Sequence, residues 1–365
     1  MSASLCQSYF SLFIDIDGIV WSFGENQYGQ LGVEDIENRS DSPEKIHFLP
    51  LIHLVACGHY HSLFLDFEGF VWSCGLNEYG QLGLGDYELR TIPQKIQTVT
   101  EIQKIACGRD HSILLGNAGQ LWAFGHNGYG ELGVGDRAHK LQATLIERIP
   151  PSTTIQAIFC GGDTSMFIDL EGSVWCCGNN EFGQLGLGDN IHRSVPEKVS
   201  HLDRIQAVSC GRDHSIFLNL DGEVFACGFN KFGQLGLGDT ENRNIPALIS
   251  SIPIIESIAC GDFHTLLVDE HGAVWGFGIN EIFQLGFLSN TQIVVLPIKV
   301  ENLPKIHTIA CGEFLSNFVD FEGKVWSSSV IAKNTLKNDT TKNVALASIS
   351  LSIPRKNWRT KSARN

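Results

Sequence analysis

A short stretch of sequence recurs along the chain at nearly constant intervals. A degenerate copy begins at Cys6, and closer copies of the pattern CGxxHS begin at Cys57, Cys107, Cys160, Cys210, Cys260 and Cys311. The intervals between successive cysteines are 51, 50, 53, 50, 50 and 51 residues. A fixed period near fifty indicates one supersecondary unit that is repeated seven times and stacked against its neighbours.

Each unit has the pattern of short β-strands. An apolar segment such as HSLFLD is followed by an acidic turn such as DFEG, a strand with an aromatic residue, and the motif GxNxxGQLGxGD. Alternating β-branched and aromatic residues between glycine-rich turns favour antiparallel strands over helices. About four strands per unit and seven units predict an all-β fold, a seven-bladed β-propeller.

Two other propeller repeats fit the sequence less well. The period is longer than that of WD40 repeats, and their Trp-Asp dipeptide is missing. Kelch repeats have a suitable length, but their glycine doublet occurs only at Gly161–Gly162.

The repeat count predicts how the ring closes. Only six segments of the type Pro-x-Lys-Ile occur, around Pro43, Pro93, Ala143, Pro196, Pro246 and Pro297. We expect the seventh such strand to come from the alternating stretch at 343–354, which would complete the blade begun by residues 1–40. The sequence therefore predicts a single propeller over residues 1–354, with repeats that start near residues 6, 57, 107, 160, 210, 260 and 311, and a flexible basic tail at 355–365.

The charge is unevenly distributed. The formal net charge is −14, but five of the 26 basic residues lie in the last eleven positions, so residues 1–354 carry −19. An acidic body argues against nucleic acid or chromatin as the main partner. No window approaches eighteen apolar residues, and the N-terminus has no signal-peptide pattern. We expect a cytoplasmic or nuclear protein, or a bacterial effector that acts in a host cytosol, and a monomer, because a closed ring has no need to oligomerise.

The repeated cysteines and histidines are best explained by packing, because a catalytic set is needed once and a packing solution is needed in every blade. The cysteines fit small buried residues on inner strands and reduced thiols. His61, His111, His214 and His264 are expected to donate to neighbouring backbone carbonyls. Consecutive Asp-His-Ser residues of a strand point to opposite faces and cannot form a triad. We therefore predict no catalytic residue, no metal site and no cofactor.

The motif GQLGLGD also has a structural explanation. Its glycines are expected to supply positive φ or close approach of two chain segments. The leucine between them, as at Leu82 and Leu185, is expected to fill the gap between blades.

The combination of GxVWxxGxNxxGQLGxGD with xxACGxxHSxxL resembles the regulator of chromosome condensation repeat family over about residues 5–327. The resemblance implies a seven-bladed propeller. Founding members of that family are exchange factors for the Ran-type small GTPase and also bind chromatin. Relatives serve as ubiquitin-ligase modules, ciliary scaffolds, a plant ultraviolet-B receptor and bacterial effectors that act on host GTPases.

The resemblance also implies where a partner would bind. In the exchange factors the GTPase meets one face, formed largely by the variable residues between the repeat's Gly and His. The acidic residues expected there are Asp110, Asp163 and Asp213 at the second variable position, and Asp262 and Glu313 at the first. His264 corresponds to the histidine of a later blade. The predicted partner-binding set is completed by two cations of the same loops, Arg109 and Arg212.

Two functions follow as expectations. The first is a protein-interaction propeller that binds a small GTPase of the Ran or Rab class and acts as its guanine-nucleotide exchange factor. The family's exchange factors insert a β-hairpin wedge, and the longest interval here, around 137–154, is only 53 residues. The alternative is a scaffold or adaptor that docks peptides or partner domains without exchange activity. The plant photoreceptor fits less well, because its motif has Trp where this chain has pairs such as His59-Tyr60.

Overall fold

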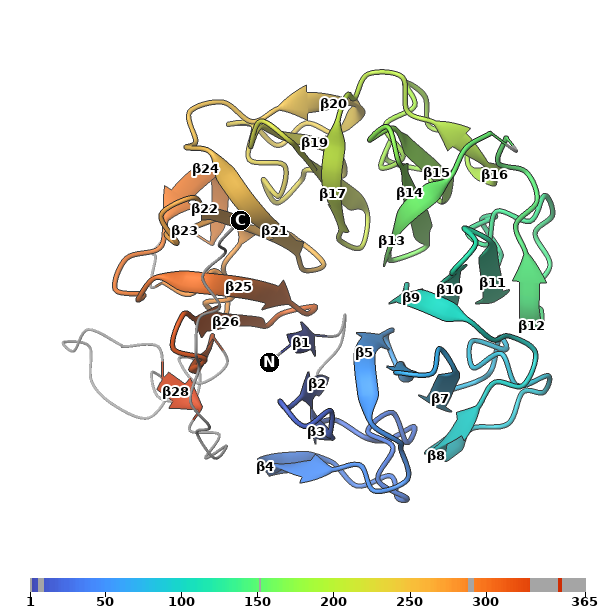
Figure 1. The fold of residues 1–365 in the computed structure, drawn as a ribbon. Coiled ribbons are helices and arrows are strands. Elements are labelled where there is room, and N and C mark those ends of the chain that lie inside the picture. The colour runs from blue at the N-terminus through green and yellow to red at the C-terminus, as the bar shows by residue number, and fades with distance from the viewer. Residues whose placement is uncertain (1, 6–9, 151, 288–291, 329–346, 350–365) are drawn as a thin grey trace, which may run out of the picture.

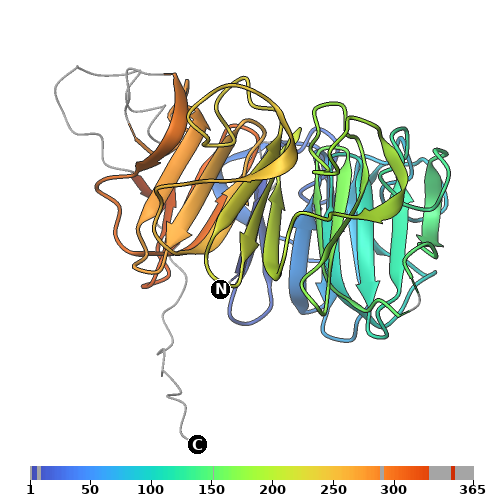
Figure 2. The same cartoon turned by 90° about the horizontal axis from the view of Figure 1, so that it is seen from above.

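The computed structural model describes residues 2–5, 10–150, 152–287, 292–328 and 347–349, which form 28 strands in seven four-stranded antiparallel sheets. Figure 1 shows the sheets arranged as blades around a central axis. Figure 2 shows that the strands run along this axis, so that their loops form two opposite faces. The prediction of an all-β, seven-bladed propeller is confirmed. In the described residues no helix is present that could span a bilayer.

Each blade takes its strands in chain order from the axis outward. The inner strands are β1 (Ser2–Leu5), β5 (Ile52–Cys57), β9 (Ile102–Cys107), β13 (Ile155–Gly161), β17 (Ile205–Cys210), β21 (Ile255–Cys260) and β25 (Ile306–Cys311). The second strands are β2 (Phe10–Ile14), β6 (His61–Asp66), β10 (His111–Gly116), β14 (Thr164–Asp169), β18 (His214–Asn219), β22 (His264–Asp269) and β26 (Ser316–Asp320). These second strands are buried along almost their whole length.

The outer half of each blade carries the aromatic strand and the edge strand. The aromatic strands are β3 (Val20–Gly24), β7 (Val71–Gly75), β11 (Leu121–Gly125), β15 (Val174–Gly178), β19 (Val224–Gly228), β23 (Val274–Ile279) and β27 (Val325–Ser327). The edge strands are β4 (Arg39–Lys45), β8 (Arg90–Lys95), β12 (Lys140–Leu145), β16 (Arg193–Lys198), β20 (Arg243–Leu248), β24 (Ile293–Lys299) and β28 (Ala347–Ile349).

Each blade begins with the strand that precedes the repeated cysteine, whereas the sequence repeats were counted from the cysteine itself. The inner strands β5, β9, β17, β21 and β25 end at the repeated cysteine, so CGxxHS forms the turn into the second strand. The repeat starts near 57, 107, 160, 210, 260 and 311 therefore mark turns, whereas the start near residue 6 and the tail at 355–365 lie outside the described residues.

The closing strand lies where the sequence predicted it but joins a different blade. β28 lies within 343–354 and pairs antiparallel with β27, so it completes the seventh blade. The first blade is complete without it, because β1 pairs with β2 and β4 pairs with β3. The prediction that 343–354 completes the blade begun by residues 1–40 was therefore wrong. The ring closes by packing of β1 between β25 and β5.

The aromatic strands are tied to the preceding turn by a repeated hydrogen bond. The indole Nε1–H of Trp72 donates to Asp66 Oδ2 at 3.1 Å, and the backbone N–H groups of Glu68 and Phe70 donate to Asp66 Oδ1. The same Trp–Asp bond occurs in four other blades, at Trp21, Trp175, Trp275 and Trp326. The acidic residue therefore has a structural role in these five blades, whereas Gly116 and Asn219 stand at its position in the other two.

The histidines bond to side-chain hydroxyls of the next blade. His61 Nε2 lies 3.0 Å from Ser112 Oγ in the next blade, and His264 Nε2 lies 2.8 Å from Ser316 Oγ. The hydroxyl partner was not predicted, and it arises because the ring projects across the blade boundary; His111 and His214 also have the backbone contact that the sequence predicted, with Thr164 and Asp262. The histidines are structural, since burial lowers the pKa of His61 to about 4 and keeps the ring neutral.

Nine of the cysteines in the described residues are free thiols, and all of them except the half-buried Cys160 are buried. These nine are Cys74, Cys107, Cys160, Cys176, Cys177, Cys210, Cys227, Cys260 and Cys311. Burial raises the pKa of the Cys210 thiol to about 12, which makes it unreactive. Cys57 is disulfide-bonded, so the prediction that all cysteines are reduced is wrong for this residue.

The repeated leucine packs between blades as predicted. Leu185 is fully buried in a cluster with Met166 and Ile168 of its own blade and Val208 and Phe217 of the next. The contacts of this side chain therefore stabilise the ring as well as the blade.

Candidate functional site

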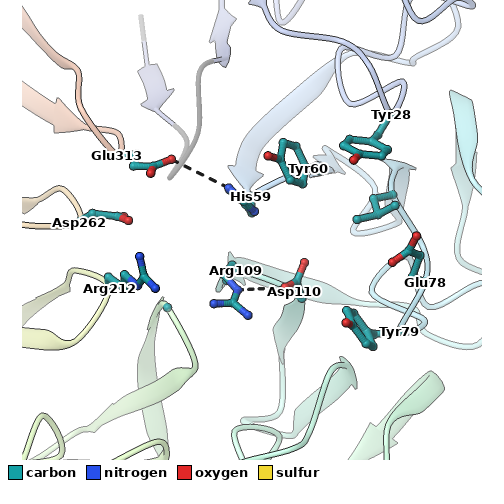
Figure 3. Close-up of a pocket in the computed structure, with 12 residues that line it drawn as sticks. Tyr28, His59, Tyr60, Glu78, Tyr79, Arg109, Asp110, Arg212, Asp262 and Glu313 are labelled. Carbon is teal, nitrogen blue, oxygen red and sulfur yellow. Dashed lines mark hydrogen bonds and ion pairs between the residues drawn. The ribbon is translucent and has the colours of Figure 1, made fainter. Parts of the chain in front are cut away.

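The turns between inner and second strands surround a cavity at one end of the axis. This cavity has a volume of about 380 Å³. We call it the mouth; it is lined by Tyr28, His59, Tyr60, Leu76, Glu78, Tyr79, Arg109, Asp110, Gly162, Arg212, Asp262 and Glu313. Figure 3 shows side chains from several blades pointing toward one another across the mouth.

Backbone hydrogen bonds join neighbouring turns around the mouth. The N–H of His59 donates to Arg109 O at 2.9 Å, and the N–H of Arg109 donates to Gly162 O at 2.8 Å. Gly162 has φ +25°, and a Cβ there would lie 2.1 Å from Arg212 O. Only glycine lets these two turns approach so closely. The turns therefore form a rigid support for their variable side chains.

Seven of the eight predicted partner-binding residues lie in this ring of turns. Arg109, Asp110, Arg212, Asp262 and Glu313 line the mouth, and Asp163 and Asp213 stand in the same turns beside it. Within this predicted set five carboxyl groups stand beside two guanidinium groups, and Glu78 adds a further carboxyl group to the lining. The mouth is suited to bind a positively charged surface.

Each arginine is held by a carboxylate of its own turn. Arg109 Nε donates to Asp110 Oδ2 at 3.1 Å, and its Nη1 lies 3.9 Å from Asp163 Oδ2. Arg212 Nε lies 3.6 Å from Asp213 Oδ2. Both arginine side chains are nearly half exposed, so these pairs are partly screened by water.

Burial keeps several of these carboxyl groups from ionising easily. Desolvation raises the pKa of Asp262 to about 7, and the nearby carboxylate of Glu313 adds to this rise. Desolvation likewise raises the pKa of Asp213 to about 6. A cation from a partner would relieve both effects, because it favours the ionised form.

The predicted role of His264 is not compatible with its position. The residue is fully buried, and its Nε2 contacts Ser316 Oγ inside the ring. It therefore does not present its imidazole at the mouth. His59, which lines the mouth and lies 4.0 Å from Glu313, is the accessible histidine there.

The structure adds aromatic residues that the sequence prediction missed. Tyr28 and Tyr79 come from the loops between aromatic and edge strands, and Tyr60 comes from the turn after β5. The rings of Tyr28 and Tyr60 are 4.7 Å apart. The signal was present in the repeat, because the second position after its Asn holds Tyr28, Tyr79, Tyr129, Phe182 and Phe232.

An aromatic rim continues around the mouth. Phe232 and Phe263 have ring centroids 5.1 Å apart, and the guanidinium of Arg212 lies 5.7 Å from the Phe263 centroid. Half-buried aromatic rings beside carboxylates can bind cationic and apolar side chains of a partner. The face therefore has the chemistry of a protein-binding surface.

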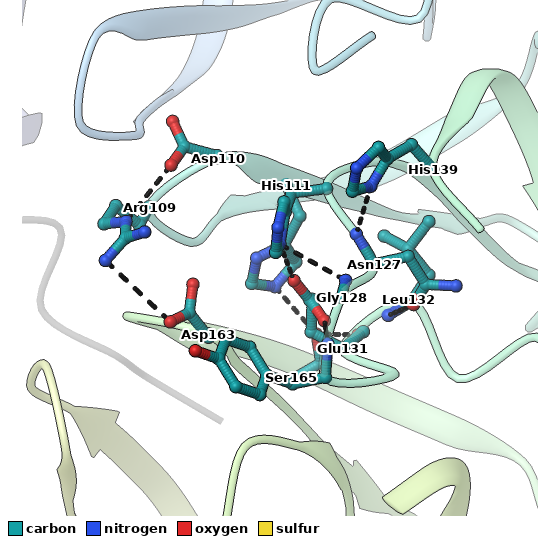
Figure 4. A network of polar contacts seen from close by, with 12 residues as sticks. Arg109, Asp110, His111, Asn127, Gly128, Glu131, Leu132, His139, Asp163 and Ser165 are labelled. Carbon is teal, nitrogen blue, oxygen red and sulfur yellow. Dashed lines mark hydrogen bonds and ion pairs between the residues drawn. The ribbon is translucent and has the colours of Figure 1, made fainter. Parts of the chain in front are cut away.

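A second polar cluster lies at the edge of the mouth. His126, Glu131 and Asp163 have ligand atoms within 4.8 Å of one another. Figure 4 shows Arg109 between Asp163 of this cluster and Asp110, with a contact to each. Neither His126 nor Glu131 was singled out from the sequence.

The segment with the longest interval contains no inserted hairpin in its described residues. Residues 140–145 form the edge strand β12, which pairs with β11 of its own blade. All strands of the described ranges belong to the seven blades.

Comparison with known proteins identifies the repeat. A family model described as Regulator of chromosome condensation (RCC1) repeat matches residues 17–65, 68–115, 118–168, 171–218, 221–268 and 271–319. A second model of the same description matches residues 52–81, 102–131, 155–184 and 205–234.

Curated relatives match over parts of the chain. The ultraviolet-B receptor UVR8 of Arabidopsis thaliana is 33% identical over 189 residues, which are 51% of this chain and 43% of the relative. The human RCC1-like G exchanging factor-like protein is 38% identical over 94 residues, which are 24% of this chain and 20% of the relative. The matched segments thus span less than half of the length of these relatives.

The fold is also that of solved propellers. The crystal structure of Prp20p from Saccharomyces cerevisiae, described with its binding properties to Gsp1p and histones, has a TM-score of 0.75 at 23% identity. The match covers 87% of this chain and 82% of that one. Human WBSCR16 gives a TM-score of 0.76 at 24% identity, with 85% and 84% covered. At these identities the likeness establishes the fold.

Proposed function

The chain belongs to the regulator of chromosome condensation (RCC1) repeat family, and on that premise we propose that it is a protein-interaction propeller whose mouth binds a small GTPase. The observation that carries the proposal is the ring of carboxyl groups, Asp110, Asp163, Asp213, Asp262 and Glu313, on turns fixed by the backbone. We propose a GTPase of the Ran or Rab class.

Two relatives support this choice of partner. Prp20p, which has the same fold, is described with its binding properties to Gsp1p, and one curated relative is named as a G exchanging factor-like protein. These descriptions concern those proteins. The acidic mouth of this chain supplies an independent reason to expect a basic protein surface as its partner.

Nucleotide exchange would need no covalent chemistry from this chain. An exchange factor must bind the nucleotide-free GTPase more tightly than the nucleotide-bound form. Carboxylates near the phosphate site can compete for the lysine or the Mg²⁺ that holds the nucleotide. The charge of the mouth also disfavours a state in which the nucleotide's phosphates face it closely.

The second candidate function is a scaffold that binds a partner without exchange. The observation that favours it is that every described strand belongs to a blade, which leaves no wedge-like hairpin among the described residues. The aromatic rim suits peptide or domain docking as well as GTPase binding.

Release of fluorescent GDP from a panel of Ran- and Rab-class GTPases separates the two functions. We expect acceleration of one member by the folded chain, and loss of that acceleration in Asp110→Asn combined with Asp213→Asn. Binding of a GTPase without faster release would support the scaffold. No binding to any member would reject the proposed partner class.

A further inference from the structure

We propose that His126, Glu131 and Asp163 form a site for a divalent transition-metal ion of the zinc class. One ring nitrogen of His126 and one oxygen of each carboxylate lie within 4.8 Å of one another. His126 and Glu131 come from the loop between β11 and β12, and Asp163 comes from the turn after β13 in the next blade. The ion would therefore link two blades at the edge of the mouth.

Glu131 departs from the repeat in a way that the fold does not require. The equivalent position is glutamine in five other units, at Gln30, Gln81, Gln184, Gln234 and Gln284. In each of them Oε1 accepts the N–H of the residue two positions earlier. Glu131 Oε2 accepts the same bond from Tyr129 N at 2.9 Å. The structural role is thus filled by one oxygen, and the second is a fully buried, additional acceptor.

In the next blade a glutamine occupies the position of Glu131 and bonds to the neighbouring carboxylate. Gln184 Nε2 donates to Asp213 Oδ1 at 3.4 Å. The equivalent pair is Glu131 and Asp163, two carboxylates that have no proton to share when both are ionised. They need a cation between them.

Of the three groups, Asp163 is the one that is paired most weakly, through one long ion pair with Arg109. It is only 9% exposed, so little water reaches its carboxylate. The nearest cation is Arg109 Nη1, which lies 3.9 Å from Asp163 Oδ2 and beyond hydrogen-bond distance. A buried carboxylate in this state is energetically costly unless something neutralises it.

His126 presents its Nδ1 to Glu131, with a carboxylate oxygen of Asp163 in the same cluster. Its ring is held between Tyr79, with centroids 4.8 Å apart, and His139, with centroids 4.7 Å apart. Nδ1 contacts Glu131 Oε1 and also faces the N–H of Gly128 at 3.4 Å. When Nδ1 is unprotonated, its single lone pair can bind a metal ion, whereas a proton on Nδ1 would be donated to Glu131 Oε1.

The donor set selects the class of ion. One imidazole and two carboxylates are ligands that Zn²⁺ takes in three-ligand sites, with a further position open to water or a partner group. The competing explanation is a proton on His126, which would give an ion pair with Glu131. A bound metal ion and a protonated His126 would each neutralise the negative charge of the carboxylates, and metal titration distinguishes the two.

The experiment uses the untagged full-length chain after removal of metal with a chelator. Zn²⁺ binding is measured by calorimetry, and Co²⁺ binding by its visible absorption. We expect one equivalent of metal, with affinity lowered at least about tenfold by Glu131→Gln and by His126→Leu. Glu131→Gln introduces the residue of the other units, and His126→Leu introduces the Leu76 of the preceding blade, so both variants are expected to fold.

The reverse experiment transplants the proposed ligands into the next blade and tests whether that blade gains metal binding. Asn179 and Gln184 occupy the positions of His126 and Glu131 in the next blade, where Asp213 corresponds to Asp163. Asn179→His combined with Gln184→Glu should therefore add a second equivalent of metal. Absence of metal binding by the wild-type chain, binding that is unchanged in Glu131→Gln, or a transplant that adds no equivalent would each contradict the proposed ligand set.

Discussion

His61 Nε2 lies 3.0 Å from Ser112 Oγ, so an imidazole of one blade is bonded to a hydroxyl of the next. Ser112 Oγ in turn donates to Gln81 O at 3.0 Å, which requires His61 to donate through Nε2–H. Equivalent bonds join His111 to Ser165, His214 to Thr265 and His264 to Ser316. Polar bonds therefore hold successive blades together inside the ring.

The fourth blade offers a natural control for this bond. It has Thr164 at the histidine position, so Ser215 only donates, to Gln184 O at 2.8 Å. We expect Ser112→Ala to cost about 1–3 kcal/mol more free energy of unfolding than Ser215→Ala, because it also leaves a buried His N–H without an acceptor. Urea denaturation of both variants measures the difference. Equal losses would show that the His–Ser bond adds no stability.

Leu185 should be a main contributor to packing between blades. It is fully buried among residues of two blades. Leu185→Ala is expected to lower the free energy of unfolding by about 2–5 kcal/mol, because it leaves a cavity. Leu185→Met keeps the volume and should cost less than about 1.5 kcal/mol. A loss of similar size in both variants would argue against a packing role.

The raised pKa of Asp262 predicts a pH dependence of stability. Its carboxyl group has a pKa of about 7 in the folded chain and an ordinary value of 3.8, and burial is the main cause, with Glu313 and Asp213 raising it and Arg212 and Arg109 lowering it. Between these values the folded protein holds a proton that the unfolded chain has released. The free energy of unfolding should therefore fall as pH rises through this window and become constant above it.

Asp262→Asn removes this dependence. We expect the variant to match the wild type at about pH 4 and to be more stable than the wild type at about pH 8. Chemical denaturation at both pH values checks this. A wild-type chain that gains stability relative to the variant as pH rises would show that Asp262 is ionised and paired in the folded state.

Most of the architecture could be predicted from the repeat, because two motifs recur at a nearly constant spacing in six units. The seventh edge strand was located at 343–354 but assigned to the wrong blade, since the sequence does not show that β1 supplies the first blade's inner strand. The histidine acceptors could not be predicted, because Ser112 and His61 are 51 residues apart and meet only through the ring.

The loops that form the site could be predicted from the sequence, but not every residue that lines it. The variable positions between Gly and His do converge at the mouth, as Arg109, Asp110 and Asp262 show. The resemblance placed His264 in the binding set, but its side chain is buried against Ser316, in line with the structural role that the repeat itself predicted. Glu131 could have been found, since it is the single departure from glutamine among six units.

The measurement that tests the central claim most directly is the affinity of nucleotide-free Ran- and Rab-class GTPases for three forms of this chain. These are the wild type, Asp110→Asn with Asp213→Asn, and the control Glu68→Gln with Glu171→Gln. The control changes the same charge on exposed turns at the opposite end of the strands. The account predicts binding of one GTPase that is at least about tenfold weaker only in the mouth variant. Equal affinity for all three forms, or no binding of any GTPase to the folded chain, would contradict it.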